Sequence, residues 1–159
     1  MFGRPQDLPA GRQFLIGCVA ASFITLFFGY RLLFPIVNPL LFAIAHTLLI
    51  GVSWIALLAY CKKLERWLQS ASAVFGCGAI TNLVSLPIYS QALESGIAGT
   101  ADAPGPGVLL LLLPRIWELA ISALIIRESI EISTGRSIGL AVIMSFAIEI
   151  CLSMMFKPG

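Results

Sequence analysis

Long apolar runs alternate with short polar or proline-containing segments along the whole chain. Crossing the hydrocarbon core of a bilayer takes about 20 apolar residues per helix, so the chain has room for about five spans and almost no domain outside the membrane. We therefore predict an all-α polytopic membrane protein, a single integral membrane domain over residues 1–159 built as a bundle of five transmembrane helices. The predicted spans are residues 14–30, 40–60, 71–93, 108–126 and 138–156.

Prolines mark several of the expected interruptions. Pro35 and Pro39 lie four residues apart, and because proline lacks a backbone donor and restricts the residue before it, they predict a tight turn after the first helix. Pro87 lies inside the third run and should kink that helix or end it early. Residues 94–107 are rich in glycine and proline and predict a true loop. The first run is followed by no small-x-small cleavage site, so we interpret it as a retained helix rather than a signal peptide.

The basic residues are distributed unevenly between the two sides of the predicted bundle. Lysine and arginine near the ends of spans resist translocation. If the N-terminus is cytoplasmic, seven of the ten basic residues lie on the cytoplasmic side, Arg31 and Lys157 lie on the other side, and Arg115 lies within a span. This predicts a cytoplasmic N-terminus and a C-terminus outside. The seven cytoplasmic basic residues are Arg4, Arg12, Lys62, Lys63, Arg66, Arg127 and Arg136.

The composition excludes several classes of protein. Hydrophobic residues make up 58% of the chain and charged residues 11%, whereas a soluble domain carries about 25% charged residues. The net charge of +2 is too small for a nucleic-acid-binding protein, which needs a dense basic face. The four cysteines show no C-x-x-C spacing and His46 is the one histidine, so we expect no metal site. No nucleophile motif is found, and we expect no catalytic residue and no cofactor.

Polar and ionisable residues lie at the same depth on several of the predicted spans. Arg115 and Glu149 are each 11 residues from the cytoplasmic end of their spans, which is about 16 Å at ~1.5 Å per residue. Asn82 shares this level. Glu118 is three residues from Arg115 and so lies on the same helix face, while Glu149 on the adjacent antiparallel helix can pair with Arg115. Because ionisable groups in hydrocarbon are costly, we predict an intramembrane polar cluster of Arg115, Glu118, Glu149, Asn82 and His46.

Two hypotheses account for this cluster. Two carboxylates facing one guanidinium leave a formal charge of −1, which requires a protonated glutamate or a further donor such as Asn82 or His46. The cluster is either a proton or ion relay or polar binding pocket built on Glu118, Glu149 and Arg115, or an interhelical ion pair that specifies helix packing. The second hypothesis is favoured by the sequence, because no polar ladder runs from the cluster toward either surface. We likewise expect His46 to be a packing or hydrogen-bonded histidine.

The last two spans carry a resemblance to a known family. Residues 113–126 read LPRIWELAISALII, with Trp117 near the start of the fourth span, and the short link STGRS at residues 133–137 precedes the fifth span. Together with five spans and Pro87 in the third, the chain resembles the Yip family, the Ypt/Rab-interacting membrane proteins, as a prokaryotic relative. The resemblance implies a five-helix membrane fold and a role in membrane organisation or partner binding, with small GTPases as partners in eukaryotes.

From these features we expect a non-enzymatic integral membrane scaffold or partner-binding protein, Yip-like, in the bacterial cytoplasmic (inner) membrane. Its expected partners are membrane lipid and a protein partner or a second copy of the chain. The alternative is a small proton-coupled transporter or channel subunit that uses Glu118 and Glu149. A partner would meet the charged cytoplasmic surface, for which a lipid-headgroup-facing role is the alternative. The residues of this predicted cytoplasmic surface are Lys62, Lys63, Arg66, Arg127 and Arg136.

Overall fold

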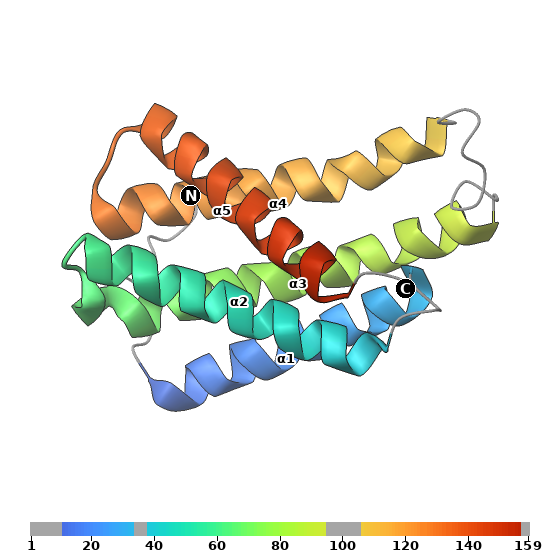
Figure 1. The fold of residues 1–159 in the computed structure, drawn as a ribbon, viewed down its shortest axis with the longest axis horizontal. Helices are drawn as coiled ribbons and strands as arrows, with labels where there is room; N and C mark the ends of the chain where they lie inside the picture. The colour runs from blue at the N-terminus through green and yellow to red at the C-terminus, as the bar shows by residue number, and fades with distance from the viewer. Residues whose placement is uncertain (1–10, 34–37, 95–105, 157–159) are drawn as a thin grey trace.

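Five long α-helices make up most of the structure, a computed structural model that describes residues 11–33, 38–94 and 106–156. Over these residues there is no strand, which confirms the predicted all-α class. A short 3₁₀ helix, η2, lies between the second and third α-helices. The bounds are α1 Arg12–Leu33, α2 Pro39–Tyr60, η2 Leu64–Arg66, α3 Trp67–Glu94, α4 Pro106–Ile130 and α5 Thr134–Met155 (Figure 1).

Four of the helices, α1, α2, α3 and α5, are long and apolar enough to cross a membrane. Much of their apolar surface faces outward, with Ile16, Val52 and Ile143 all largely exposed. Outward-facing apolar side chains over whole helices are what a lipid environment requires and what water disfavours. The fourth helix, α4, has a comparable length of 25 residues but carries more charge. Its charged residues are Arg115, Glu118, Arg127 and Glu128.

The predicted spans match the five helices to within four residues at each end. The larger differences, at the start of α3, the end of α4 and the start of α5, all extend the helix beyond the apolar run. Helical backbone hydrogen bonds continue into the polar residues that flank each apolar run, so the length of an apolar run underestimates the length of the helix. The predicted loop at residues 94–107 lies mainly outside the described residues, apart from Glu94 at the end of α3 and the first turn of α4.

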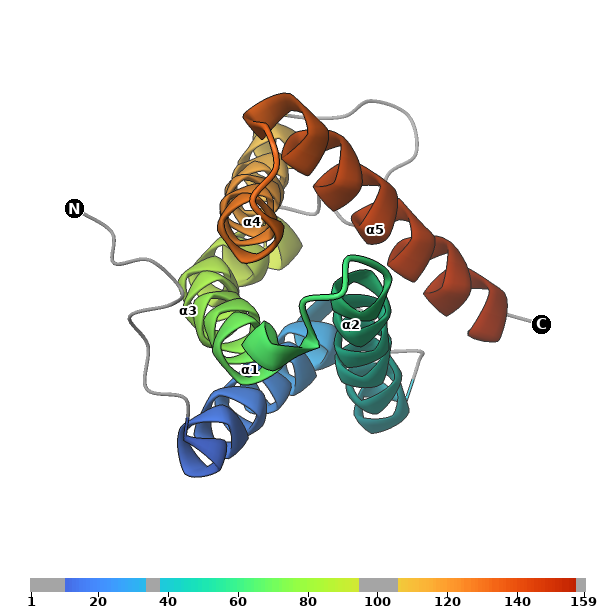
Figure 2. The ribbon, with the colours of Figure 1, turned by 90° about the vertical axis from the view of Figure 1, so that its left-hand side faces the viewer.

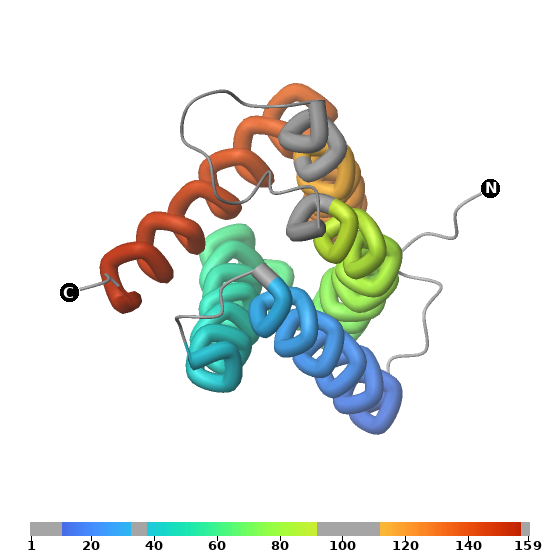
Figure 3. The backbone as a smooth tube through the Cα atoms, turned by 90° about the vertical axis from the view of Figure 1, so that its right-hand side faces the viewer, coloured from blue at the N-terminus to red at the C-terminus, as the bar shows by residue number. Residues whose placement is uncertain are grey.

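The helices pack around α3, which lies between α1 and α4 and contacts both extensively. The last helix, α5, packs on α4 and on α2, and it crosses the bundle obliquely rather than running parallel to its neighbours (Figures 1 and 2). Viewed from the opposite end, α5 diverges from α4 toward the C-terminus (Figure 3). There Phe156 meets Phe42 of α2, with ring centroids 4.8 Å apart. The end of α5 therefore packs on α2 instead of α4.

Four prolines lie within or at the start of described helices: Pro39 begins α2, Pro87 lies inside α3, Pro106 begins α4 and Pro114 lies inside α4. Pro39 is the first residue of α2, and Asn38 caps that helix by accepting hydrogen bonds from the backbone N–H groups of Leu40 and Leu41 at 3.1 and 3.3 Å. Proline at this position loses no intrahelical bond. Pro87 does not end α3, which continues to Glu94, so the prediction of an early end is wrong. The extended packing of α3 on α1 outweighs the single backbone hydrogen bond that Pro87 removes.

The turn after α2 contains a residue in the left-handed backbone conformation. Lys62 has φ of 56°, and this left-handed conformation costs a residue with a Cβ atom about 1–2 kcal/mol. Glycine avoids that cost, offset by about 0.5–1 kcal/mol of extra unfolded-chain entropy. Lys62→Gly is therefore expected to stabilise the folded protein in detergent by about 0.5–1 kcal/mol, measured as the shift in thermal unfolding midpoint. Lys62→Ala removes the same charge but retains the Cβ atom, and an equal gain in that variant would contradict the prediction.

Candidate functional site: a polar cavity among the helices

A cavity of about 280 Å³ is lined by side chains from all five α-helices. We call it the central cavity. All five residues of the predicted polar cluster line it, so the structure brings together groups that are more than 100 residues apart in the chain. The polar and charged lining residues are Ser22, Thr25, Tyr30, His46, Thr81, Asn82, Tyr89, Arg115, Glu118, Ser122 and Glu149.

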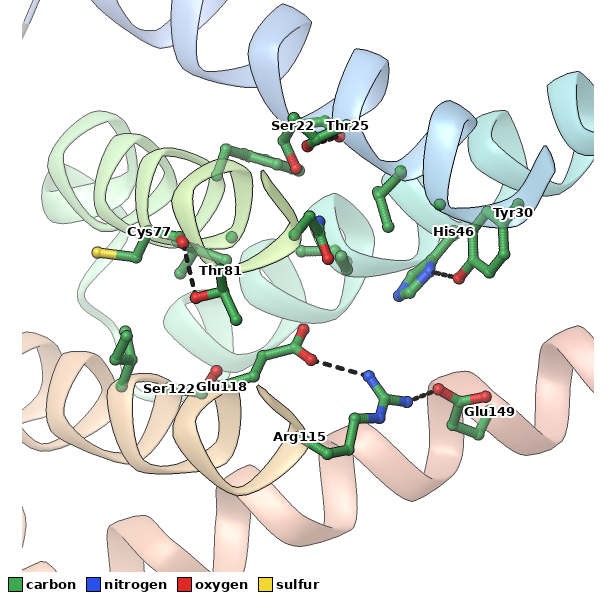
Figure 4. A pocket seen from close by; sticks show the side chains of 18 of the residues that line it. Ser22, Thr25, Tyr30, His46, Cys77, Thr81, Arg115, Glu118, Ser122 and Glu149 are labelled. Carbon is green, nitrogen blue, oxygen red and sulfur yellow. Dashed lines mark hydrogen bonds and ion pairs between the residues drawn. The ribbon is translucent and has the colours of Figure 1, made fainter. Parts of the chain in front are cut away.

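Arg115 joins two carboxylates from two helices. Its Nη1 donates to Oε2 of Glu118, one turn further along α4, at 2.8 Å, and its Nη2 pairs with Oε1 of Glu149 on α5. Figure 4 shows the guanidinium between the two carboxylates, with Glu118 on one side and Glu149 on the other. The predicted pairing of Arg115 with both glutamates is thus present in the structure. We call these three residues the arginine–carboxylate network.

The network faces open space rather than packed core. The side chains of Arg115, Glu118 and Glu149 keep 39%, 34% and 46% of their surface exposed. A second, smaller cavity of about 60 Å³, which reaches Trp54 on α2 and Met144 on α5, is lined by the same three residues. The network therefore borders two cavities at once. An ion pair whose only role is to join helices would be expected to lie within packed side chains.

The charge of the network is not balanced by the neighbours that the sequence suggested. Arg115 carries one positive charge against two carboxylates, and in the part of the chain that the structure describes no hydrogen bond from Asn82 or His46 reaches either glutamate. The formal charge is −1 when both carboxylates are ionised. This excess negative charge attracts a cation.

His46 instead forms a hydrogen bond with α1. The Tyr30 hydroxyl and His46 Nδ1 are hydrogen-bonded, as Figure 4 shows, and His46 is buried. The Tyr30 ring lies 4.4 Å from that of Phe42, centroid to centroid. The hydrogen bond agrees with the expectation for His46, and its partner Tyr30 ends the first apolar run, where the sequence does not indicate that this side chain points inward.

Two threonine hydroxyls of the cavity wall donate their protons to backbone carbonyl groups. Thr25 Oγ1 donates to the carbonyl oxygens of Ala21 and Ser22 at 3.0 and 2.9 Å, and Thr81 Oγ1 donates to Cys77 at 3.0 Å. Such back-bonding is common for threonine in apolar helices. It consumes the donor of each hydroxyl and leaves oxygen lone pairs free to accept. The sequence does not distinguish either threonine, because single hydroxyls in membrane helices form no distinctive pattern.

The predicted cytoplasmic surface is partly engaged in contacts within the chain. Arg66 Nη1 donates to the carbonyl oxygens of Glu128 and Ser129, both at 3.1 Å, and its Nη2 pairs with Glu131 at 2.6 Å. Lys63 Nζ lies 3.5 Å from the same carboxylate. Arg66 thereby satisfies carbonyl groups at the C-terminus of α4, where a cation is also favoured by the helix dipole.

The remaining members of that surface differ in their availability. Arg127 pairs with the adjacent Glu128 at 2.7 Å. Lys62 and Arg136 are exposed and make no ion pair with any residue that the structure describes. The surface predicted for a partner is therefore reduced to two uncommitted cations, since Lys63, Arg66 and Arg127 have partners within the chain.

No candidate metal site exists among the described residues, where no three His, Cys, Asp or Glu side chains converge. The four cysteines are free. In comparisons with known proteins, no family model, no curated protein and no solved structure matches the chain.

The contacts of Glu131 predict how stability depends on pH. The hydrogen bond from Arg66 and the nearby cations of Arg66 and Lys63 hold the pKa of Glu131 below its ordinary value of 4.5. Since the pKa is lowered in the folded state, the stabilisation is present above pH 4.5 and is lost as the pH falls through the lowered folded-state value. We expect Glu131→Gln to lower the thermal midpoint at neutral pH, with the difference from wild type vanishing in acid. A midpoint difference that does not shrink as the pH is lowered below 4.5 would contradict this prediction.

Proposed function

We propose that the chain is a non-enzymatic integral membrane protein that acts as a small proton-coupled transporter or channel subunit, with the central cavity as its binding site. The observation that carries the proposal is the arginine–carboxylate network, which faces a cavity of about 280 Å³ instead of packed core. Ionisable groups that face an intramembrane cavity commonly lie on ion or proton pathways.

The position of Glu149 supports a coupling mechanism. It is the α5 residue that lines the central cavity among those the structure describes, and its ion pair with Arg115 links α5 to α4. Protonation of Glu149 neutralises that link while Glu118 continues to balance Arg115. Loss of the link removes the charged contact between α5 and α4 at the level of the cavity, while the apolar packing of the two helices nearer their connection remains. Proton binding is thereby coupled to the contact between α4 and α5 at the cavity.

The proposal includes a topology. We propose five spans in a bacterial inner membrane, with the N-terminus cytoplasmic and the C-terminus outside. The connection between α2 and α3 contains Lys62, Lys63 and Arg66, and the connection between α4 and α5 is flanked by Arg127 and Arg136. Arg31 lies at the C-terminal end of α1, on the opposite side of the bundle. This asymmetry supports the orientation, since basic residues are retained on the cytoplasmic side.

Replacement of Glu149 tests the proposal. In proteoliposomes containing an internal pH indicator, wild-type protein is expected to carry proton flux driven by a potassium diffusion potential. Glu149→Gln should reduce that flux about tenfold or more, because the amide cannot exchange a proton. Glu65→Gln, which removes an exposed carboxylate of η2, is the matched control and should retain the flux.

The structural hypothesis predicts a different outcome for the same variant. If the network serves only to join helices, Glu149→Gln lowers thermal stability by about 1–3 kcal/mol for a partly exposed ion pair, and wild-type liposomes show no more proton flux than empty ones. Absence of wild-type flux from correctly folded protein would refute the proposed function.

A second candidate, the Yip-like scaffold, is supported by the exposure of Lys62 and Arg136 at the same end of the bundle. These two cations are the part of the predicted cytoplasmic surface left for an acidic partner, because Arg66 is held by α4. The combined Lys62→Gln and Arg136→Gln variant is expected to lose co-purifying protein while keeping its thermal midpoint. Retention of every co-purified partner would remove the scaffold candidate.

A further inference from the structure

We propose that the ligand of the central cavity is a small molecule bearing a primary ammonium group. The inference rests on the proposed function in one respect, that the central cavity is a binding site, and it adds the chemical class of the ligand. Three independent properties of the cavity lead to it: its charge, the hydrogen-bonding character of its wall, and the aromatic rings at one end.

The charge of the cavity calls for a cation. Arg115, Glu118 and Glu149 are the formally charged side chains among the described residues that line it. Each carboxylate uses one oxygen to bind Arg115, which leaves one oxygen on each glutamate to accept from a ligand. A monovalent cation between them brings the total charge to zero. An anionic ligand would raise the negative excess to −2 and is disfavoured in a partly desolvated site.

Two hydroxyls of the wall favour a ligand that donates hydrogen bonds. Thr25 and Thr81 both donate their hydroxyl protons to backbone carbonyls of their own helices. The lone pairs of the two hydroxyl oxygens therefore remain to accept hydrogen bonds from a ligand. Figure 4 shows the Thr81 hydroxyl bonded to Cys77 on the same helix. A primary ammonium group has three N–H donors and no acceptor, as in lysine, and it matches such a wall. A bare alkali-metal ion would lack this directionality, and a quaternary ammonium ion would lack the donors.

The size and the aromatic lining favour an organic ammonium. Tyr30, Phe42 and Tyr89 line the cavity, and aromatic faces attract cations by about 0.5–2 kcal/mol. The volume of about 280 Å³ falls just below the range of roughly 300–1,000 Å³ typical of pockets for drug-sized ligands. A molecule of a few heavy atoms fits this space. The primary ammonium group can belong to a free amine or to the ethanolamine headgroup of a phospholipid.

Binding of ethylammonium to the wild-type protein tests the inference. The protein is placed in nanodiscs of phosphatidylcholine and phosphatidylglycerol at pH 7, and heat release is measured on addition of ethylammonium, tetramethylammonium, acetamide or acetate. We expect saturable binding of ethylammonium, with tetramethylammonium, neutral acetamide and anionic acetate all at least about tenfold weaker. Binding of acetamide or acetate as tight as that of ethylammonium overturns the inference, as does absence of ethylammonium binding.

Three variants locate the binding to the cavity. Glu118→Gln removes the excess negative charge but keeps the link between α4 and α5, so it should fold and should bind ethylammonium about tenfold more weakly or worse. Thr81→Val keeps every charge and the side-chain shape, and it should weaken binding several-fold. Glu65→Gln is the matched control with one carboxylate removed elsewhere, and it should bind as wild type. Wild-type affinity in Glu118→Gln overturns the inference.

The two sources of the ammonium group are separated by adding phosphatidylethanolamine to the nanodiscs. Loss of ethylammonium affinity shows that the lipid headgroup occupies the cavity, and unchanged affinity shows that a free amine is the ligand. Both results support the ammonium class. Proton flux by wild-type protein without ethylammonium binding refutes the ligand alone, whereas ethylammonium binding without flux upholds the ligand and refutes transport.

Discussion

The bridge from Arg115 to Glu118 and Glu149 is the constraint on which the organisation of the cavity depends. A guanidinium cannot lose its charge inside an apolar bundle, so α4 must bring partners to it. Glu118 comes from the same helix face and already balances the charge of Arg115, and α5 adds a second carboxylate, Glu149. The contact between Arg115 and Glu149 joins α5 to α4 at the level of the cavity, whereas the C-terminal end of α5 lies against α2. The position of α5 is thus determined by charge as well as by apolar packing.

Two points along α4 are held by different kinds of interaction. Near the α2–α3 connection, Arg66 binds carbonyl oxygens of Glu128 and Ser129, and backbone carbonyls do not titrate. At the cavity, α4 is joined to α5 through Glu149, a carboxylate that can accept a proton. One attachment of α4 is therefore permanent and the other depends on protonation. The C-terminal end of α4 therefore keeps its contact with Arg66 while the contact between α4 and α5 at Arg115 depends on the charge of Glu149.

Sequence patterns predicted the helices and the charged centre of the site, but not its wall. Spans follow from apolar run length, and the pairing of Arg115 with Glu149 follows from equal depth on antiparallel helices. The wall depends on which single hydroxyls face inward, and Thr25 and Thr81 differ from lipid-facing residues only through their packing. The sequence also could not predict the carbonyl partners of Arg66, because they belong to the backbone of a helix more than 60 residues away along the chain. Pro87 within α3 shows that packing can override a local helix-breaking signal.

The structural and functional hypotheses for the network are less opposed than the sequence suggested. An ion pair that keeps a third or more of its surface exposed, as this one does, adds little to stability. An ion pair at the border of two cavities is therefore a poor device if helix packing is its sole role. It becomes useful when one carboxylate must change its charge, because the same contact then both holds α5 and responds to a proton or a cation. The net charge of −1 supplies that response, since it leaves the site one positive charge short of balance.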